Sequence, residues 1–257
     1  GQVMGAAVGG CEVRDGGTAA AERVEGGETG TVTGGGRVGM VGVRAPSGAG
    51  GGKGENAWPC EAEARAGLTR LVSGAAVELR FDERREDRHG HLLAQVTVIR
   101  GDDRIWLQDD LVARGLIRVF SLADARACVA ALLARDDEAR RARRGLWRSW
   151  AYRVEDADDV KRLGRLTHSY QLVEGTVHAV GEGRKLIYVN FAQDWRKDFT
   201  ITIARKDLAA FEAAGLDLAR LPGNRVRVRG IVEWWNGPMI AATHPEQIEV
   251  LGPAPAL

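Results

Sequence analysis

Lysine, cysteine and long apolar runs are all scarce in this chain of 257 residues. Lysines number only five, the other cationic side chains are arginines, and the formal net charge is +1. A nearly neutral chain has no general attraction for a polyanion, so any contact with nucleic acid must come from local patches. No apolar run is long enough to cross a bilayer, and we therefore expect no membrane span.

The three cysteines, Cys11, Cys60 and Cys128, lie far apart in the sequence. They form no Cys-x-x-Cys pair and have no histidines at metal-ligand spacing, which argues against a zinc site. Their odd number argues against a disulfide framework. The fold is therefore expected to rest on an ordinary hydrophobic core, and the hydrophobic fraction of 44% is typical of one.

The first half of the chain changes from glycine-rich to helical. Residues 1–57 are rich in Gly and Thr, and only 38–43 has the pattern of a buried strand. Further on, the patterns predict helices over 61–71, 109–114 and 122–145, and strands over 76–81, 92–99 and 104–108. The basic run that ends the long helix is either a solvated helix terminus, favoured by the helix dipole, or a phosphate-binding site.

The second half begins with a polar, charged segment over 151–168, which we interpret as a linker. Strand patterns then cover 172–180, 186–191 and 199–203, a helix fits 206–214, and strands resume at 225–234 and 247–251. Three strands, a helix and two strands is the element order of an OB-fold barrel. The sequence thus predicts an N-terminal segment over 1–10, a first domain over 11–150, the linker, and a second domain over 169–257.

Several motifs in the first half occur at fixed spacings. The stretch DRHGHLLAQVTVIRGDDRIWLQDDLVARGLIRV covers 87–119, and EARRARRGLW covers 138–147. They are similar to the motifs D-R-x-G-R-x-L-A-x-V, L-V-x-x-G-L-A-x-V and E-x-x-A-x-x-x-x-x-G-L-W of the staphylococcal-nuclease (thermonuclease) family. Upstream, residues 13–18 resemble its V-x-D-G-D-T, and residues 39–47 resemble its R-L-x-G-I-D-A-P-E.

This resemblance covers about residues 11–148 and implies an OB-type barrel with helices. The stretches YVNFAQDWRKDFTITI (188–203) and NGPMIAATHPEQIEVL (236–251) resemble the OB-like domain that follows the nuclease domain in some bacterial proteins. The expected fold class is therefore mainly β with helices (α+β), as a nuclease-like barrel followed by a second small OB-like barrel.

The reaction that the resemblance implies uses a calcium ion held by aspartates, a carboxylate that activates water, and two arginines that stabilise the pentacoordinate phosphate. Carried over by position, the calcium aspartates fall on Gly17 and Arg44, the arginines on Gly39 and His91, and the base on Ser47. All five positions depart from the family. Arg44 even puts a positive side chain where a metal cation should bind.

Arg37 and Glu55 are the nearest substitutes. Arg37 lies two positions before Gly39, which in a strand keeps its side chain on the same face. Glu55 follows a glycine-rich loop that can bring it nearer. Because loss of one transition-state donor costs on the order of 10²–10³ in rate, we expect lost or weak phosphodiesterase activity. We expect no cofactor, and calcium only if the nuclease chemistry survives.

Nucleic-acid binding can remain after the catalytic residues are lost, because an OB-type barrel presents a curved strand face to single-stranded nucleic acid. The candidate contacts of the first domain are Arg84, Arg85, Arg88, Arg140 and Arg144. Those of the second domain are Trp195, Trp234 and the alternating Arg225, Arg227 and Arg229, which share one face of a strand. Alternatively, the tryptophans pack the barrel and the arginines pair with acids such as Asp194, Asp198 and Glu233.

The sequence leaves three functions open. The first is a nucleic-acid-binding module for single-stranded DNA or RNA. The second is an active calcium-dependent nuclease that hydrolyses DNA or RNA, and the third is a non-enzymatic scaffold or subunit that contacts proteins. The near-neutral charge slightly favours the third over the first. No leader pattern is visible, and the sequence allows a bacterial periplasmic or secreted location as well as a cytoplasmic one.

Overall fold

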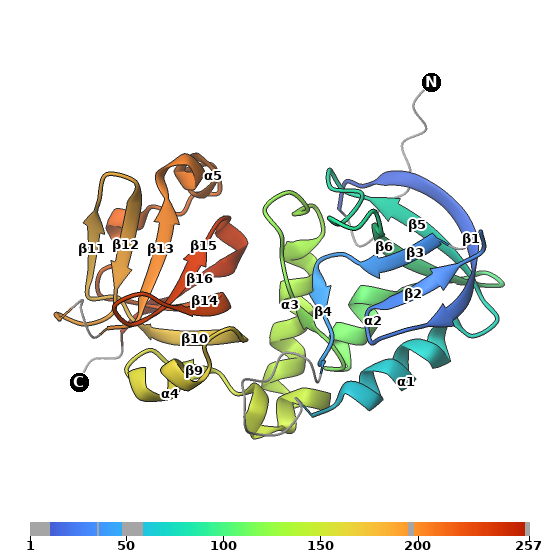
Figure 1. Ribbon diagram of the computed structural model, residues 1–257, viewed down its shortest axis with the longest axis horizontal. Helices are drawn as coiled ribbons and strands as arrows, with labels where there is room; N and C mark the ends of the chain where they lie inside the picture. The colour runs from blue at the N-terminus through green and yellow to red at the C-terminus, as the bar shows by residue number, and fades with distance from the viewer. Residues whose placement is uncertain (1–10, 35, 48–58, 195–197, 255–257) are drawn as a thin grey trace. The chain divides into compact units, whose positions relative to one another are not determined.

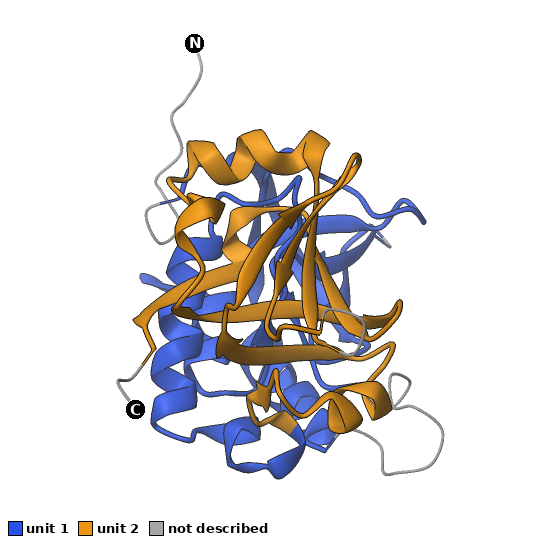
Figure 2. Cartoon of the chain, turned by 90° about the vertical axis from the view of Figure 1, so that its left-hand side faces the viewer, with its two compact units in different colours: residues 1–49, 56–151 blue, residues 50–55, 152–257 orange. Residues whose placement is uncertain are grey.

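The computed structural model describes residues 11–34, 36–47, 59–194 and 198–254. These residues fall into two compact units, the first ending at Ala151 and the second beginning at Tyr152 (Figure 2). Each unit has its own sheet and its own hydrophobic core. The predicted fold class, mainly β with helices, is confirmed.

The first unit is a closed barrel of five strands with one added edge strand (Figure 1). The strands are β1 (Arg14–Val24), β2 (Thr29–Val32), β3 (Gly36–Met40), β5 (Ala76–Phe81), β6 (Leu92–Arg100) and, at the edge, β7 (Asp103–Trp106). The sheet runs β3-β2-β1-β5-β6-β7, and parallel pairing of β3 with β6 closes it. A separate antiparallel pair joins β4 (Val43–Arg44) to β8 (Arg118–Val119).

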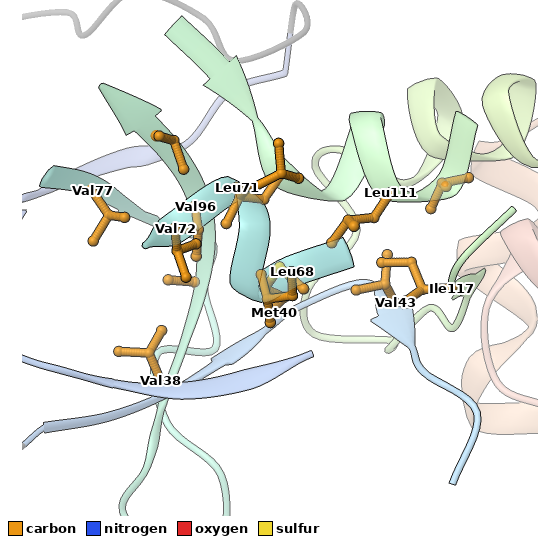
Figure 3. Close-up of a cluster of buried hydrophobic side chains, with 14 of the residues drawn as sticks. Val38, Met40, Val43, Leu68, Leu71, Val72, Val77, Val96, Leu111 and Ile117 are labelled. Carbon is orange, nitrogen blue, oxygen red and sulfur yellow. The ribbon is translucent and has the colours of Figure 1, made fainter. Parts of the chain in front are cut away.

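Helices pack against this barrel through apolar stripes. They are α1 (Glu61–Val72), α2 (Leu107–Ala113) and α3 (Val129–Arg141), with 3-10 turns at Gly145–Arg148 and Trp150–Tyr152. In α1 the buried residues recur at the three-to-four spacing that makes one helix face apolar. Figure 3 shows Leu68 and Leu71 of this helix among Met40, Val77 and Val96 from the strands. This packing positions β3.

Some of the elements expected in the first unit differ from those observed. The helix over 61–71 and the strands over 76–81 and 92–99 are confirmed. The helix expected over 122–145 begins only at Val129. The sequence does not predict β1, because the strand's residues, RDGGTAAAERV, include few large apolar side chains. Most residues of this strand are exposed.

A disulfide joins Cys11 to Cys128, with their Cα atoms 5.0 Å apart. The odd number of cysteines argues against a disulfide framework, but it does not reveal this single bond. The two residues are separated by 117 positions, and only the closed barrel brings them together, so their spacing carries no signal of the bond. Cys60 is a free thiol.

Two glycines allow the backbone to cross itself closely in the first unit. Gly115 (φ 67°) ends the turn after α2, and Gly145 (φ 52°) follows α3. A Cβ on Gly115 would lie 2.2 Å from the carbonyl oxygen of Arg144, and one on Gly145 would lie 2.2 Å from that of Gly115. Both positions need a left-handed backbone and the absence of a side chain. The crossing gives a physical reason for the glycines in the L-V-x-x-G-L and G-L-W motifs.

The second unit is built on a curled sheet that forms a half-barrel. Its strands are β9 (Glu155–Asp156), β10 (Tyr170–Thr176), β11 (Ala179–Glu182), β12 (Leu186–Asn190), β13 (Thr200–Ala204), β14 (Asn224–Trp234), β15 (Pro238–Ala242) and β16 (Ile248–Pro253). Helices α4 (Val160–Arg165) and α5 (Leu208–Ala213) and 3-10 turns at Arg205–Asp207, Leu218–Arg220 and Pro245–Gln247 complete it. The order β11-β12-β13-β15-β14-β10-β9 includes the parallel pair β13 and β15, and β16 also pairs with β14.

The segment interpreted as a linker, 151–168, is largely part of the second unit. Its strand β9 pairs with β10, and Leu163 of α4 is fully buried in the core. The polar composition conceals these two short elements, because only Ala157 and Leu163 of the segment enter that core. The strand β15, which begins with Pro238 directly after Gly237, also has no counterpart in the sequence prediction.

Candidate functional site

A groove of about 480 Å³ opens on the first unit beside β3 and β4. The turn between β5 and β6 forms another part of its wall. Its charged and titratable lining residues are Glu28, Arg37, Arg44, Arg84, Asp87, His89 and His91. Apolar residues such as Leu93 and Phe120 complete the lining, so the groove combines charged and hydrophobic surface.

Glu28 is the more buried of the two carboxylates in this groove. Its Oε2 accepts the backbone N–H of Ala45 at 2.9 Å. Burial raises the pKa of Glu28, while that hydrogen bond and the nearby positive charge of Arg44 act in the opposite direction. The Arg44 guanidinium carbon lies 5.1 Å from the centroid of the Phe120 ring, a cation–π arrangement. A carboxylate and a guanidinium thus line the same groove at the end of β4.

Asp87 is held by the turn that it begins. Its Oδ1 accepts the N–H groups of His89 at 2.7 Å and His91 at 3.0 Å, and its Oδ2 lies 3.0 Å from Nδ1 of His91. Desolvation acts to raise the pKa of Asp87, but the hydrogen bonds from His91 and His89 outweigh it and lower this pKa to about 2. So weak a base is poorly suited to take a proton from water near neutral pH.

The titration of Asp87 gives a first test of this geometry. Because its pKa in the fold lies below the usual value of about 3.9, the stabilisation from its ionised form is present above that value and is lost as the pH falls toward 2. We expect NMR titration of the Asp87 side-chain carboxyl carbon to show a midpoint near pH 2. A midpoint near 4 would show that the hydrogen bonds from the turn do not form in solution.

The arginines around the groove are positioned by neighbouring groups. Nε of Arg37 lies 2.5 Å from a carboxylate oxygen of Glu25, and Arg84 lies 3.4 Å from Asp124. Arg85 and Arg88 do not line the groove but are exposed beside it. The Arg85 guanidinium carbon is 4.5 Å from the Phe81 ring centroid, and Nε of Arg88 donates to Nε2 of His89 at 3.0 Å.

Residues 37–149 match the family model described as staphylococcal nuclease homologue. This segment is a staphylococcal-nuclease-like domain. The match begins within β3, so the strands β1 and β2 that complete the barrel precede it. No curated protein matches the chain. Among the described residues, no helix has both the length and the hydrophobicity that a membrane crossing requires.

In the nuclease-like domain, the positions to which the resemblance assigns the family's catalytic residues do not all lie at the groove. Gly39, Arg44 and His91 line it, as does Arg37. Gly17 lies in the bulge of β1 where that strand pairs with β5, and Ser47 does not line the groove either. Glu55 lies outside the described residues.

Sequence reasoning missed Glu28, which does line the groove. The segment Glu25-Gly26-Gly27-Glu28-Thr29 has the order acid, glycine, acid, threonine, and so resembles D-G-D-T with one extra residue. This segment lies eleven positions after residues 13–18, counted from Thr18 to Thr29. The Asp15-Gly16 pair of residues 13–18 lies in β1, and neither residue lines the groove.

Calcium is the metal that the family implies, and the donor set of this groove does not fit it. Calcium prefers six to eight oxygen ligands, with several carboxylates among them. Among the described lining residues the carboxylates are Glu28 and Asp87, and each already accepts hydrogen bonds from the protein. Arg44 adds a fixed positive charge beside Glu28. Across the described part of the chain, no three His, Cys, Asp or Glu side chains form a metal-binding group.

The other predicted contacts of the nuclease-like domain lie outside this groove. Arg140 forms an ion pair with Asp137, one turn earlier on α3. Arg144 is exposed and donates from its guanidinium to the carbonyl oxygen of Ala113 at 3.1 Å. The structure therefore gathers Arg84, Arg85 and Arg88 around the groove but does not bring Arg140 and Arg144 into its lining.

In the second unit, the alternating arginines of β14 pair with acids of the adjacent strands. Arg225 and Arg227 both contact Glu174 of β10, at 3.1 and 2.6 Å. Arg229 contacts Glu249 of β16 at 2.8 Å, and Arg227 reaches the same carboxylate at 3.5 Å. Arg227 and Arg229 are buried. The expected pairing of arginines with acids is observed, but the partners are Glu174 and Glu249 instead of Asp194, Asp198 and Glu233.

Of the two tryptophans proposed as contacts in the second unit, the structure describes only Trp234. Trp234 is exposed at the end of β14. It does not pack inside the barrel, as one reading of the sequence predicts, but lines a groove of its own unit. Trp195 lies outside the described residues.

Proposed function

We propose that the staphylococcal-nuclease-like domain binds single-stranded DNA or RNA in the groove beside β3 and β4, and that it has lost calcium-dependent cleavage. The observation that carries this proposal is Arg44, which lines the same groove as Glu28, at the position to which the family resemblance assigns a calcium aspartate. A fixed guanidinium supplies positive charge for a phosphate without a metal ion. It also repels a divalent cation from the same place.

The loss of cleavage follows from the groups that the reaction needs. Gly39 has no side chain and His91 is hydrogen-bonded to Asp87, so neither provides the arginine that would stabilise a pentacoordinate phosphate. Each missing donor is worth on the order of 10²–10³ in rate. Without the two arginines and the metal, the groove keeps the means of holding a phosphate chain but not of cleaving it.

The retention of binding is supported by the cations around the groove. Arg37, Arg44 and Arg84 line it, and Arg85 and Arg88 flank it on the exposed turn. A cationic groove with aromatic surface is the usual way in which proteins bind single strands without reading their sequence. Here Phe120 supplies aromatic surface in the lining.

A binding titration on the full chain tests this proposal. We expect a labelled single-stranded oligonucleotide to be retained uncut, with the same affinity in calcium and in chelator. Arg44→Ala should weaken binding and lower the slope of log K against log salt by about 0.7, the value for one phosphate contact on a single strand. Arg104→Ala, on the exposed part of β7 outside the groove, is the matched control and should change neither quantity.

The raised pKa of Glu28 favours a second function, a working phosphodiesterase with displaced residues. In that case Glu28 would be the base and Arg37 the phosphate-stabilising cation. Chelator-sensitive cutting that disappears in Glu28→Gln or Arg37→Ala would establish this function and overturn the first. If the oligonucleotide is neither cut nor retained, both functions are overturned, and a scaffold that contacts proteins becomes the better account.

A further inference from the structure

The second unit has a groove of about 700 Å³ that the proposed function does not use. It lies over one face of β11, β12 and β13 and is bordered by the turn between β14 and β15. Its described lining residues are Gly181, Glu182, Gly183, Leu186, Tyr188, Asn190, Thr200, Thr202, Glu233, Trp234, Trp235, Asn236 and Met239.

Exposed aromatic side chains gather at this groove. Among the described residues the exposed large hydrophobic side chains are Trp150, Tyr188, Trp234, Trp235, Val250 and Leu251. Half of them line this one groove, namely Tyr188 at 38%, Trp234 at 57% and Trp235 at 78% exposure. A cluster of exposed apolar side chains on one face often marks a binding surface, whereas single exposed apolar residues are common on any protein.

Glycines hold two of these rings in place. A Cβ on Gly183 would lie 2.9 Å from the ring of Tyr188, and a Cβ on Gly164 of α4 would lie 2.9 Å from the ring of Trp234. Across the sheet, Tyr188 has Gly181 and Thr202 as its register neighbours, both of them smaller. The two rings are thus seated against backbone, and seated rings lose little conformational entropy when a ligand packs on them.

Hydrogen-bonding groups accompany the rings. The hydroxyl of Thr200 donates to Oδ1 of Asn190 at 3.3 Å, and this hydrogen bond does not use the amide N–H groups of Asn190. The Tyr188 hydroxyl and the indole N–H groups of Trp234 and Trp235 form no hydrogen bond with another described residue. The groove therefore offers donors from aromatic side chains to an incoming carbonyl oxygen.

The charges of this groove do not suit a phosphate chain. Among the described lining residues there is no lysine, arginine or histidine. Glu182 is paired with Arg205 at 2.8 Å, whereas Glu233 forms no ion pair with any described residue. Arg184 and Lys185 lie in the nearby turn but do not line the groove. Among the described lining residues, Glu233 thus carries a negative charge without an ion-pair partner, the opposite of what a polyanion requires.

Aromatic walls, indole and hydroxyl donors and a carboxylate are the features with which proteins bind proline-rich segments in the polyproline II conformation. Proline rings pack between aromatic side chains, and the solvated carbonyl oxygens of such a segment accept hydrogen bonds from tryptophan and tyrosine. The aliphatic lining residues Leu186 and Met239 favour this ligand over a carbohydrate, which presents many hydroxyls. Glu233 complements a basic side chain.

We infer that the groove of the second unit binds a proline-rich peptide segment that carries a basic residue beside Glu233. This function is separate from that of the nuclease-like domain, because its residues all belong to the second unit. Tyr188, Trp234 and Trp235 pack on the prolines, and Glu233 selects the cation.

Calorimetric titration of the full chain with a short peptide of proline–alanine repeats ending in arginine tests this inference. We expect measurable binding that weakens tenfold or more in Trp235→Ala and in Tyr188→Ala, as for aromatic anchors of an interface. Glu233→Gln should weaken it several-fold and reduce its salt dependence. The control is Trp150→Ala, which removes a tryptophan of 73% exposure outside the groove and should change nothing.

Other ligands give the results that would overturn the inference. The same titrations with oligo-dT and with a neutral oligosaccharide are run on the same variants. Loss of oligo-dT binding in Trp235→Ala, with no peptide binding, would make the groove a base-stacking surface; the corresponding result with the oligosaccharide would make it a carbohydrate site. Absence of peptide binding to the unaltered chain also refutes the inference. Arg44→Ala should leave peptide affinity unchanged, which separates this test from that of the nuclease-like domain.

Discussion

Cys128→Ser is expected to lower the free energy of unfolding of the first unit by roughly 4–5 kcal/mol. The disulfide it removes closes a loop of 117 positions, and closing so long a loop strongly restricts the unfolded chain while leaving the folded chain unchanged. Both sulfurs belong to buried residues, and Val13, Trp106 and Ala127 pack against them. The same loss is therefore expected when the unaltered chain is reduced.

Hydrogen exchange followed by mass spectrometry measures this loss unit by unit. Peptides from β5, β6 and α3 should exchange faster in Cys128→Ser, whereas peptides from β10 to β16 should not, because the bond lies within the first unit. Cys60→Ser removes a cysteine that is not cross-linked and is the matched control. Equal protection of the first unit with and without reductant would mean that the bond does not form.

Glu249→Ala is expected to destabilise the second unit by about 3–5 kcal/mol, the usual result of removing one partner from a buried ion pair. Glu249 holds Arg229 at 2.8 Å and also reaches Arg227. Both guanidinium groups are buried, and removal of the carboxylate takes a close counter-charge from Arg229 in a medium that solvates it poorly, while Arg227 keeps its contact with Glu174. The carboxylate also joins β16 to β14, so the pairing of these strands should loosen.

Denaturant unfolding followed by hydrogen exchange in β14 and β16 measures this effect. Glu212→Ala, which removes an exposed glutamate from α5 of the same unit, is the control and should cost less than about 0.5 kcal/mol. A loss for Glu249→Ala no larger than that of the control would show that the arginines of β14 are solvated. They would then again be candidates for contact with nucleic acid.

The parts of the fold that follow from the sequence are those with local patterns. The helix α1 has its apolar residues at helical spacing, and β5 and β6 combine apolar runs with a charged turn between them. The strand β1 has no such pattern and is held by pairing with β2 and β5. The disulfide is still less local, since the barrel must close before Cys11 meets Cys128.

The candidate site was predictable only in part, for a similar reason. The motif-derived positions Gly39, Arg44 and His91 line one groove, but the motif did not indicate Glu28, which lines it too. The alternation of arginines in β14 does put them on one face. Which strands lie opposite that face, and that they carry Glu174 and Glu249, depends on pairings far apart in the sequence.

The bond between Cys11 and Cys128 makes the barrel a covalent ring. All strands from β1 to β8, with α1 and α2, lie between these two cysteines. A protease that cuts once within this ring opens it into a linear chain but releases no fragment. The two sides of the groove, which come from β3 and β4 and from the turn between β5 and β6, would stay tethered after such a cut, so nicking alone does not separate the halves of the groove.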